Sequence, residues 1–190
     1  SEQDFGLSAI NYQTKSVTWV DFDNDGDNDL FITSDTQGNK LFENLGTMVF
    51  QDISVATGMI TNNMFTYGAS WGDINNDGSI DLLTLDMASE DHYRSKTNMR
   101  SMNAQEFKEM IDKGDHHQYM FNTLQLNNGS GSFSDIANIA GIAKTDWSWA
   151  GLLADLDNDG YVAPEITMDS TPSNDWTVEI MEDNNFENVE

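Results

Sequence analysis

One nine-residue stretch occurs three times in this chain and limits its fold more than any other feature. Each copy has side-chain oxygens at positions one, three and five and glycine at position six: Asp21–Asp29, Asp73–Asp81 and Asp155–Ala163. Oxygens at alternate positions of a tight turn, with a glycine that can adopt a positive φ, are typical of a calcium loop. Asp, Gly and Asn are also common in solvated turns, but three copies in register favour the metal loop.

The ligand count of each loop predicts two complete calcium sites and a third, weaker one. Position seven adds a backbone carbonyl and position nine a carboxylate that can bind with both oxygens, which approaches the six or seven oxygens that calcium takes at about 2.3–2.6 Å. Ala163 stands at position nine of the third loop, so we expect its site to be empty or to be completed by Glu165 or water. The other predicted ligands are Asp21, Asp23, Asp25, Asp27 and Asp29; Asp73, Asn75, Asp77, Ser79 and Asp81; and Asp155, Asp157, Asp159 and Tyr161.

The residues after each loop exclude a helix–loop–helix calcium module. That module needs Glu at position twelve, whereas this chain has Ile32, Thr84 and Ile166 there. Short apolar runs follow the first two loops instead, Leu30–Thr33 and Leu82–Leu85. Runs of this length and composition are typical of strands, so we expect the loops to join strands.

A longer repeat surrounds the loops. Leu41–Ser54 aligns without gaps with Leu124–Ala137, and each stretch predicts a hairpin that turns at Asn-x-Gly or Asn-Gly and brings Phe50 or Phe133 inward. Four short strands per unit indicate an all-β chain that forms part of a β-propeller, about three four-stranded blades. We predict the tail of a preceding blade at 1–14, a first blade at 15–66, a second at 67–148 with an insert at 88–118, and the start of a third with an acidic segment at 149–190.

The insert differs in composition from the rest of the chain. It contains all three histidines, His92, His116 and His117, and five of the eight basic residues. Asn103 as N-cap, an apolar face and Gly114 after the last turn predict a short amphipathic helix. A second short helix is expected at Trp176–Ile180 from the spacing of its two apolar ends.

Charge and composition exclude several partners. The 33 acidic and 8 basic residues of this 190-residue chain leave a formal charge of −25, which repels nucleic acids and anionic membranes. No run of 18 apolar residues would insert into a bilayer. The absence of cysteine excludes disulfides and Cys-based zinc sites. Calcium loops of modest affinity fill where calcium is millimolar, so we expect a secreted or cell-surface protein.

The loop pattern Asp-x-Asp-x-Asp-Gly-x-x-Asp resembles the FG-GAP or VCBS repeats of integrin-α-like β-propellers. The strings Asn122–Gly129, Thr145–Ala150 and Asp155–Gly160 are also similar to bacterial surface or secreted proteins that pair such propellers with an ASPIC/UnbV domain. This resemblance implies about seven blades, calcium in the blade loops, no catalytic residues, and binding or adhesion outside the cell. Because about three repeats cannot close a ring of four or more blades, we expect other blades or protein subunits as partners.

Three functions fit these features. The leading interpretation is a non-enzymatic, extracellular calcium-binding module for protein interaction or adhesion, with structural calcium. The alternatives are a propeller that binds carbohydrate or degrades polysaccharide, and a structural subunit of a cell-surface assembly. The histidines of the insert are the only candidates for acid–base chemistry, and Trp147 and Trp149 could stack on sugar rings, although such aromatics more often pack between blades.

Overall fold

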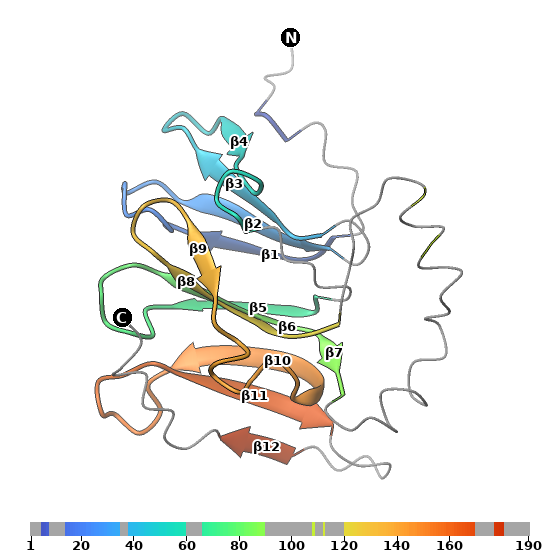
Figure 1. Ribbon diagram of the computed structural model, residues 1–190. Helices are drawn as coiled ribbons and strands as arrows, with labels where there is room; N and C mark the ends of the chain where they lie inside the picture. Colours follow the sequence, from blue (N-terminus) through green and yellow to red (C-terminus); the bar gives the residue numbers. More distant parts are fainter. Residues whose placement is uncertain are drawn as a thin grey trace.

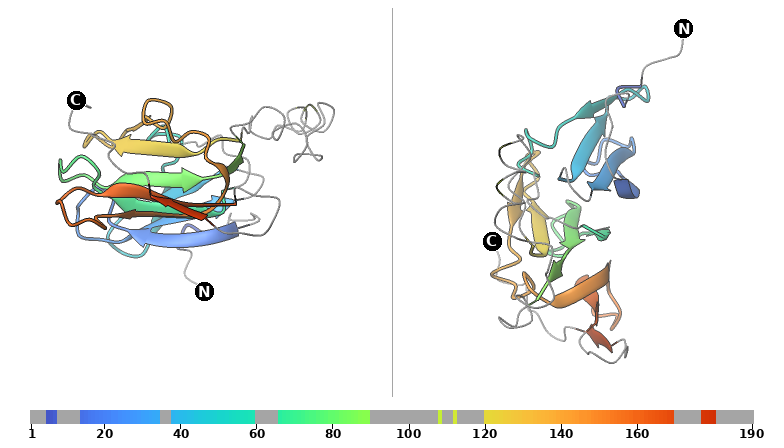
Figure 2. Two further views of the ribbon diagram at one scale, coloured as in Figure 1. Left: turned by 90° about the horizontal axis from the view of Figure 1, so that it is seen from below. Right: turned by 90° about the vertical axis from the view of Figure 1, so that its right-hand side faces the viewer.

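The computed structural model contains three four-stranded antiparallel sheets, stacked one after another in chain order (Figure 1). It describes residues 5–7, 14–34, 38–59, 66–89, 108, 112, 120–169 and 177–180, of which 168–169 and 177–180 are described by their backbone alone. The right-hand view of Figure 2 shows that the second sheet lies between the other two. The predicted all-β class is confirmed.

The first two sheets have the same order of strands. The first consists of β1 (Thr14–Val20), β2 (Asp29–Ser34), β3 (Lys40–Asn44) and β4 (Phe50–Asp52), and the second of β5 (Gly68–Gly72), β6 (Asp81–Leu85), β8 (Thr123–Asn127) and β9 (Phe133–Asp135). The two predicted apolar runs form β2 and β6, which are buried along their whole length because both of their faces are covered. Both predicted hairpins are confirmed, since Asn44 pairs with Phe50 and Asn127 with Phe133.

The third sheet takes one strand from the second repeat. Its order is β12 (Thr177–Ile180), β11 (Ala163–Asp169), β10 (Asp146–Ala154) and β7 (Met87–Ala88). The chain leaves β6, crosses to the third sheet and pairs Ala88 with Asp146. The strand pairing therefore includes Ala88, the first residue of the predicted insert.

One local expectation for the third sheet is wrong. The predicted helix at Trp176–Ile180 is a strand over Thr177–Ile180, because pairing with β11 overrides the weak local helix signal. Pro164 lacks a backbone N–H, yet it pairs with Leu153 near the start of β11. It lies just before the Glu165–Met168 segment that pairs with β12, so its missing N–H is not needed on that side.

Most of the insert lies outside the described residues. This holds for Asn103 and Gly114, which bound the predicted helix, and for the three histidines. Lys108 and Asp112 are described, and both are helical and exposed. Within the described part of the chain, no helix has the length and apolar character needed to cross a membrane.

Aromatic side chains join the first sheet to the second. Phe31 of β2 is fully buried, and the ring of Trp71 from β5 meets it edge-on with 5.3 Å between the ring centroids. Leu41 of β3 and Leu82 of β6 belong to the same buried cluster. Edge-to-face packing of this kind adds about 0.5–1.5 kcal/mol to the gain from burial alone.

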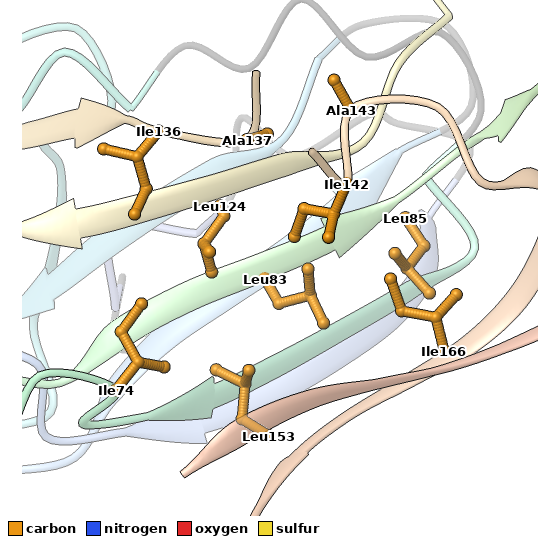
Figure 3. Packing of buried hydrophobic residues seen from close by; sticks show 10 residues of the cluster. All are labelled: Ile74, Leu83, Leu85, Leu124, Ile136, Ala137, Ile142, Ala143, Leu153 and Ile166. Carbon is orange, nitrogen blue, oxygen red and sulfur yellow. The ribbon is translucent and has the colours of Figure 1, made fainter. Parts of the chain in front are cut away.

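Aliphatic side chains join the second sheet to the third. Leu83 and Leu85 of β6 pack with Leu153 of β10 and Ile166 of β11 (Figure 3). Gly151 permits this close approach, because a Cβ there would lie 2.8 Å from Cδ1 of Leu85 and 2.9 Å from Cδ2 of Leu83. The three sheets thus share two continuous apolar interfaces that hold their loops in a fixed order.

Candidate metal centre

The three acidic loops occupy the same place in the three sheets. Loop 1 (Asp21–Asp29) joins β1 to β2, loop 2 (Asp73–Asp81) joins β5 to β6, and loop 3 (Asp155–Ala163) joins β10 to β11. All three lie along one side of the stack, on the left in Figure 1. Position nine opens the second strand and pairs with the residue just before position one: Val20 with Asp29, Gly72 with Asp81, and Ala154 with Ala163.

The backbone turns in the same way in each loop. Glycine at position six has a left-handed conformation, with φ of 93° at Gly26, 87° at Gly78 and 92° at Gly160. The predicted positive φ is confirmed. Position four is also left-handed, with φ of 60° at Asn24, 57° at Asn76 and 63° at Asn158. Asn is among the few residues that adopt this conformation readily.

The carboxylate at position one organises each turn. In loop 1, Asp21 accepts hydrogen bonds from the backbone N–H groups of Asp25 and Gly26, both at 3.1 Å. The equivalent bonds in the other loops are those of Asp73 with Asp77 at 3.1 Å and Gly78 at 2.9 Å, and of Asp155 with Asp159 at 3.1 Å and Gly160 at 3.0 Å. Position one is therefore held in place by the turn that it stabilises.

The side chains at positions three and five also accept backbone N–H groups, each from the residue two places further along the loop. Position three accepts the N–H of position five in Asp23, Asn75 and Asp157, at 3.2–3.3 Å. Position five accepts the N–H of position seven, as in Asp25 with Asp27 at 2.8 Å, Asp77 with Ser79 at 2.7 Å and Asp159 with Tyr161 at 2.8 Å. Each of these side-chain oxygens also has lone pairs that a cation could use.

Carboxylate oxygens converge in loops 1 and 3. Asp21, Asp23 and Asp29 each place one oxygen within 4.8 Å of the others, and so do Asp155, Asp157 and Asp159. In loop 2 the amide of Asn75 replaces the carboxylate of position three and donates to Asp77 at 2.9 Å. Calcium accepts amide oxygens as well as carboxylates, so all three loops offer hard oxygen ligands of the kind it prefers.

Position nine has a second role that the sequence did not indicate. Asp29 is almost fully buried, and its carboxylate accepts the backbone N–H of Phe22 at 3.2 Å and of Asn44 at 2.8 Å. Asp81 accepts those of Ile74 at 2.9 Å and Asn127 at 2.8 Å in the same way. This carboxylate therefore ties the loop to the end of the third strand of its sheet.

Burial changes the acidity of these two carboxyl groups. It raises the pKa of Asp29 to about 6, against the hydrogen bonds from Asn44 and Phe22, and the negative charges of Asp23 and Asp25 raise it further. The pKa of Asp81 is raised to about 6 for the same reasons. A cation in the loop would oppose this shift, because it favours the ionised form.

Loop 3 lacks this anchor. Ala163 occupies position nine, and Glu165 lies two residues further along β11, on the same face. Glu165 is 9% exposed, and its Oε2 has no hydrogen-bond partner among the described residues. Burial and the negative charge of Asp157 raise the pKa of this carboxyl group. Glu165 thus lies near the loop but is not one of its three convergent carboxylates.

The two aromatic candidates for sugar binding lie on one strand, and one of them packs against another ring. Trp149 of β10 contacts Tyr67 with 5.6 Å between ring centroids, and it stays 39% exposed. Trp147 belongs to the part of β10 that pairs with Met87 of β7. Lys15 lies over the Tyr67 ring, with its Nζ 5.3 Å from the ring centroid.

Sequence reasoning missed the asparagines that fasten the loops. The side chains of Asn44 and Asn127 donate to the carbonyls of Asn28 and Ile80, at 3.1 and 3.3 Å, while their backbone N–H groups bind position nine. Asn127 also donates to the carbonyl of Phe22 in loop 1 at 2.9 Å. The signal was present, because these two asparagines occupy the same place in the aligned hairpin stretches.

Residues 6–84 match the family model of FG-GAP-like repeats. This segment contains loops 1 and 2, strands β1, β2 and β5, and all but the last residue of β6, so the similarity to FG-GAP-like repeats covers both of these loops. The resemblance found in the loop pattern is confirmed there. A comparison with curated proteins finds no match.

Proposed function

We propose that the chain is part of a calcium-binding β-propeller that serves protein interaction or adhesion outside the cell. FG-GAP-like repeats suggest a propeller-like interaction module. In this proposal the three sheets are three blades of a ring of about seven, and other blades or protein subunits complete it. The extracellular location rests on the resemblance of three strings to secreted or surface proteins with an ASPIC/UnbV domain: Asn122–Gly129, Thr145–Ala150 and Asp155–Gly160.

One observation carries the proposal: the same acidic turn stands at the same register position in all three sheets. Its carboxylates lie close enough to repel one another. Burial, together with the charges of Asp25 and Asp21, raises the pKa of Asp23 against its backbone hydrogen bonds. A bound divalent cation would turn this repulsion into attraction and stiffen the turn between two strands. The ion is structural in this proposal, and the module binds rather than catalyses.

Calcium titration by calorimetry, with the chain first stripped of metal by a chelator, tests the proposal. We expect two tighter sites at loops 1 and 2, a weaker site at loop 3, and little heat with magnesium. Asp25→Ala and Asp77→Ala should each remove one tight site. Asp112→Ala is the matched control, because it removes an exposed charge outside the loops. Absence of calcium binding at millimolar concentration, or equal losses in the control, would contradict the proposal.

Carbohydrate binding is the second candidate, and the exposed ring of Trp149 favours it. This ring could stack on a sugar while Tyr67 supports it from behind. A glycan array would identify a ligand, and Trp149→Ala should abolish its binding. Trp19→Ala is the matched control, because it removes another exposed tryptophan, on β1 in a different sheet. No binding across a broad glycan panel would leave protein interaction as the function.

A further inference from the structure

The three loops are joined to one another by a hydrogen bond that recurs. Nδ2 of Asn24 in loop 1 donates to the carbonyl of Gly78 in loop 2 at 2.9 Å. Nδ2 of Asn76 in loop 2 donates to the carbonyl of Gly160 in loop 3 at 3.0 Å. In both cases position four of one loop binds position six of the next, so the contact is a property of the repeat rather than a local coincidence.

These bonds connect the parts of each loop that hold the carboxylates. Position four lies between the side chains of positions three and five. Position six donates its own N–H to position one, as Gly78 does to Asp73 at 2.9 Å. The Gly78 peptide is thus bound by its own loop through its N–H and by loop 1 through its carbonyl. Ordering of either loop therefore restrains the other.

We infer that Asn24 and Asn76 are positioning residues that couple the three loops into one cooperative cation-binding row. The inference deepens the proposed calcium function and rests on it. An ion that orders loop 2 fixes the carbonyl that Asn24 binds and the side chain with which loop 2 binds loop 3. The next ion then has less to order, which is positive cooperativity without a change of fold. Because coupling free energy is reciprocal, loss of one Asn weakens binding on both sides of the bond.

The chain contains its own control for this inference. Asn158 has the same position and a φ of 63°, like its two equivalents, yet its amide has no hydrogen-bond partner in the part of the chain that the structure describes. Replacement by glycine removes the side chain and tolerates positive φ at all three positions. The same backbone effect is therefore expected in Asn24→Gly, Asn76→Gly and Asn158→Gly. Only the first two variants lose a loop-to-loop bond.

Calcium calorimetry on the whole chain tests the coupling. We expect Asn24→Gly and Asn76→Gly to weaken the apparent affinity by about twofold to tenfold, the range that one hydrogen bond supplies, and to lower the Hill coefficient towards one. Asn158→Gly should leave both quantities unchanged. If all three variants behave alike while calcium still binds, the coupling is wrong and the calcium function stands. If the wild-type chain does not bind calcium, both are wrong.

A double-mutant cycle separates coupling from a merely structural role. Asp25→Ala disables loop 1, and we expect it to weaken the remaining sites by about twofold to tenfold in the wild-type background. In the Asn24→Gly background it should weaken them no further. An equal effect in both backgrounds would overturn the inference, even if Asn24→Gly lowers the melting temperature.

Discussion

Loops 1 and 2 differ from loop 3 at position nine, and the difference separates two tasks within one motif. All three have the same turn, with the same left-handed residues and the same bonds to position one. In loops 1 and 2, Asp29 and Asp81 then tie the turn to the third strand, whereas Ala163 cannot. The turn therefore forms without position nine, which adds the connection to the sheet and, in the proposed calcium site, the ligand that closes the shell.

The largest expected effect comes from removal of that connection. Asp81→Ala would leave the buried N–H groups of Ile74 and Asn127 unpaired, so we expect it to lower the free energy of unfolding by about 2–4 kcal/mol. Urea unfolding in the presence of a chelator measures this without any contribution from calcium. Asp159→Ala at position five of loop 3 is the control and should change stability by less than about 1 kcal/mol, because this position is exposed. Equal losses in the two variants would contradict the proposed role of position nine.

The pKa of the carboxyl group at position nine should also distinguish loops 1 and 2 from loop 3. The pKa of Asp29 and Asp81 in the folded chain is about 6, above the ordinary value of 3.8. Between these pH values the folded chain binds more protons than the unfolded chain, so the stability of the metal-free protein falls as pH rises from about 4 to about 6. Asp29→Asn combined with Asp81→Asn should flatten this slope in a series of denaturant titrations. An unchanged slope would contradict the burial of these carboxylates.

A carboxylate added at position nine of loop 3 should bring its calcium affinity closer to that of loops 1 and 2. Ala163→Asp places a carboxylate at the register position of Asp29 and Asp81, and we expect it to raise the calcium affinity of the third site by about tenfold. Calorimetry should show this gain at the third site, with only the smaller change that the loop-to-loop bonds transmit at the first two. Glu165→Gln sharpens the comparison, because it should weaken the third site only if Glu165 completes the shell. Three equal sites in the wild type, unaffected by Ala163→Asp, would mean that position nine is not a ligand.

The smallest expected effect concerns the difference in calcium affinity between loops 1 and 2. Asn75→Asp gives loop 2 the carboxylate that Asp23 provides in loop 1, and we expect calcium to bind loop 2 about twofold to fivefold more tightly, since affinity rises with ligand charge. The metal-free protein should become slightly less stable, because the bond from Asn75 to Asp77 is lost and a like charge is added. A weaker calcium site would contradict this ranking.

The local features of the fold could be predicted because they are encoded over a few residues. The Asp and Gly positions specify the turns, and the apolar runs after them specify β2 and β6. The alignment of Leu41–Ser54 with Leu124–Ala137 correctly placed both hairpins. Each of these patterns is complete within one repeat.

Features that depend on a neighbouring strand or loop could not be predicted. β7 joins the third sheet although the second repeat contains its residues, and Thr177–Ile180 is a strand because β11 lies beside it. From the sequence alone, Asn24 and Asn76 are ordinary turn residues, because the carbonyls that they bind lie in the neighbouring loop. The buried role of position nine was hidden for the same reason, because its N–H partners Asn44 and Asn127 lie in another strand.

An anomalous difference map from crystals grown with calcium would test the central claim most directly. We predict one peak in loop 1 and one in loop 2, each within about 3 Å of a carboxylate oxygen of Asp25 or Asp77. Loop 3 should show a weaker peak, or none until Ala163 is replaced by Asp. Loops that keep the described turn but show no peak at either Asp25 or Asp77 would contradict the account, since the acidic turns would then stabilise the sheets without a metal.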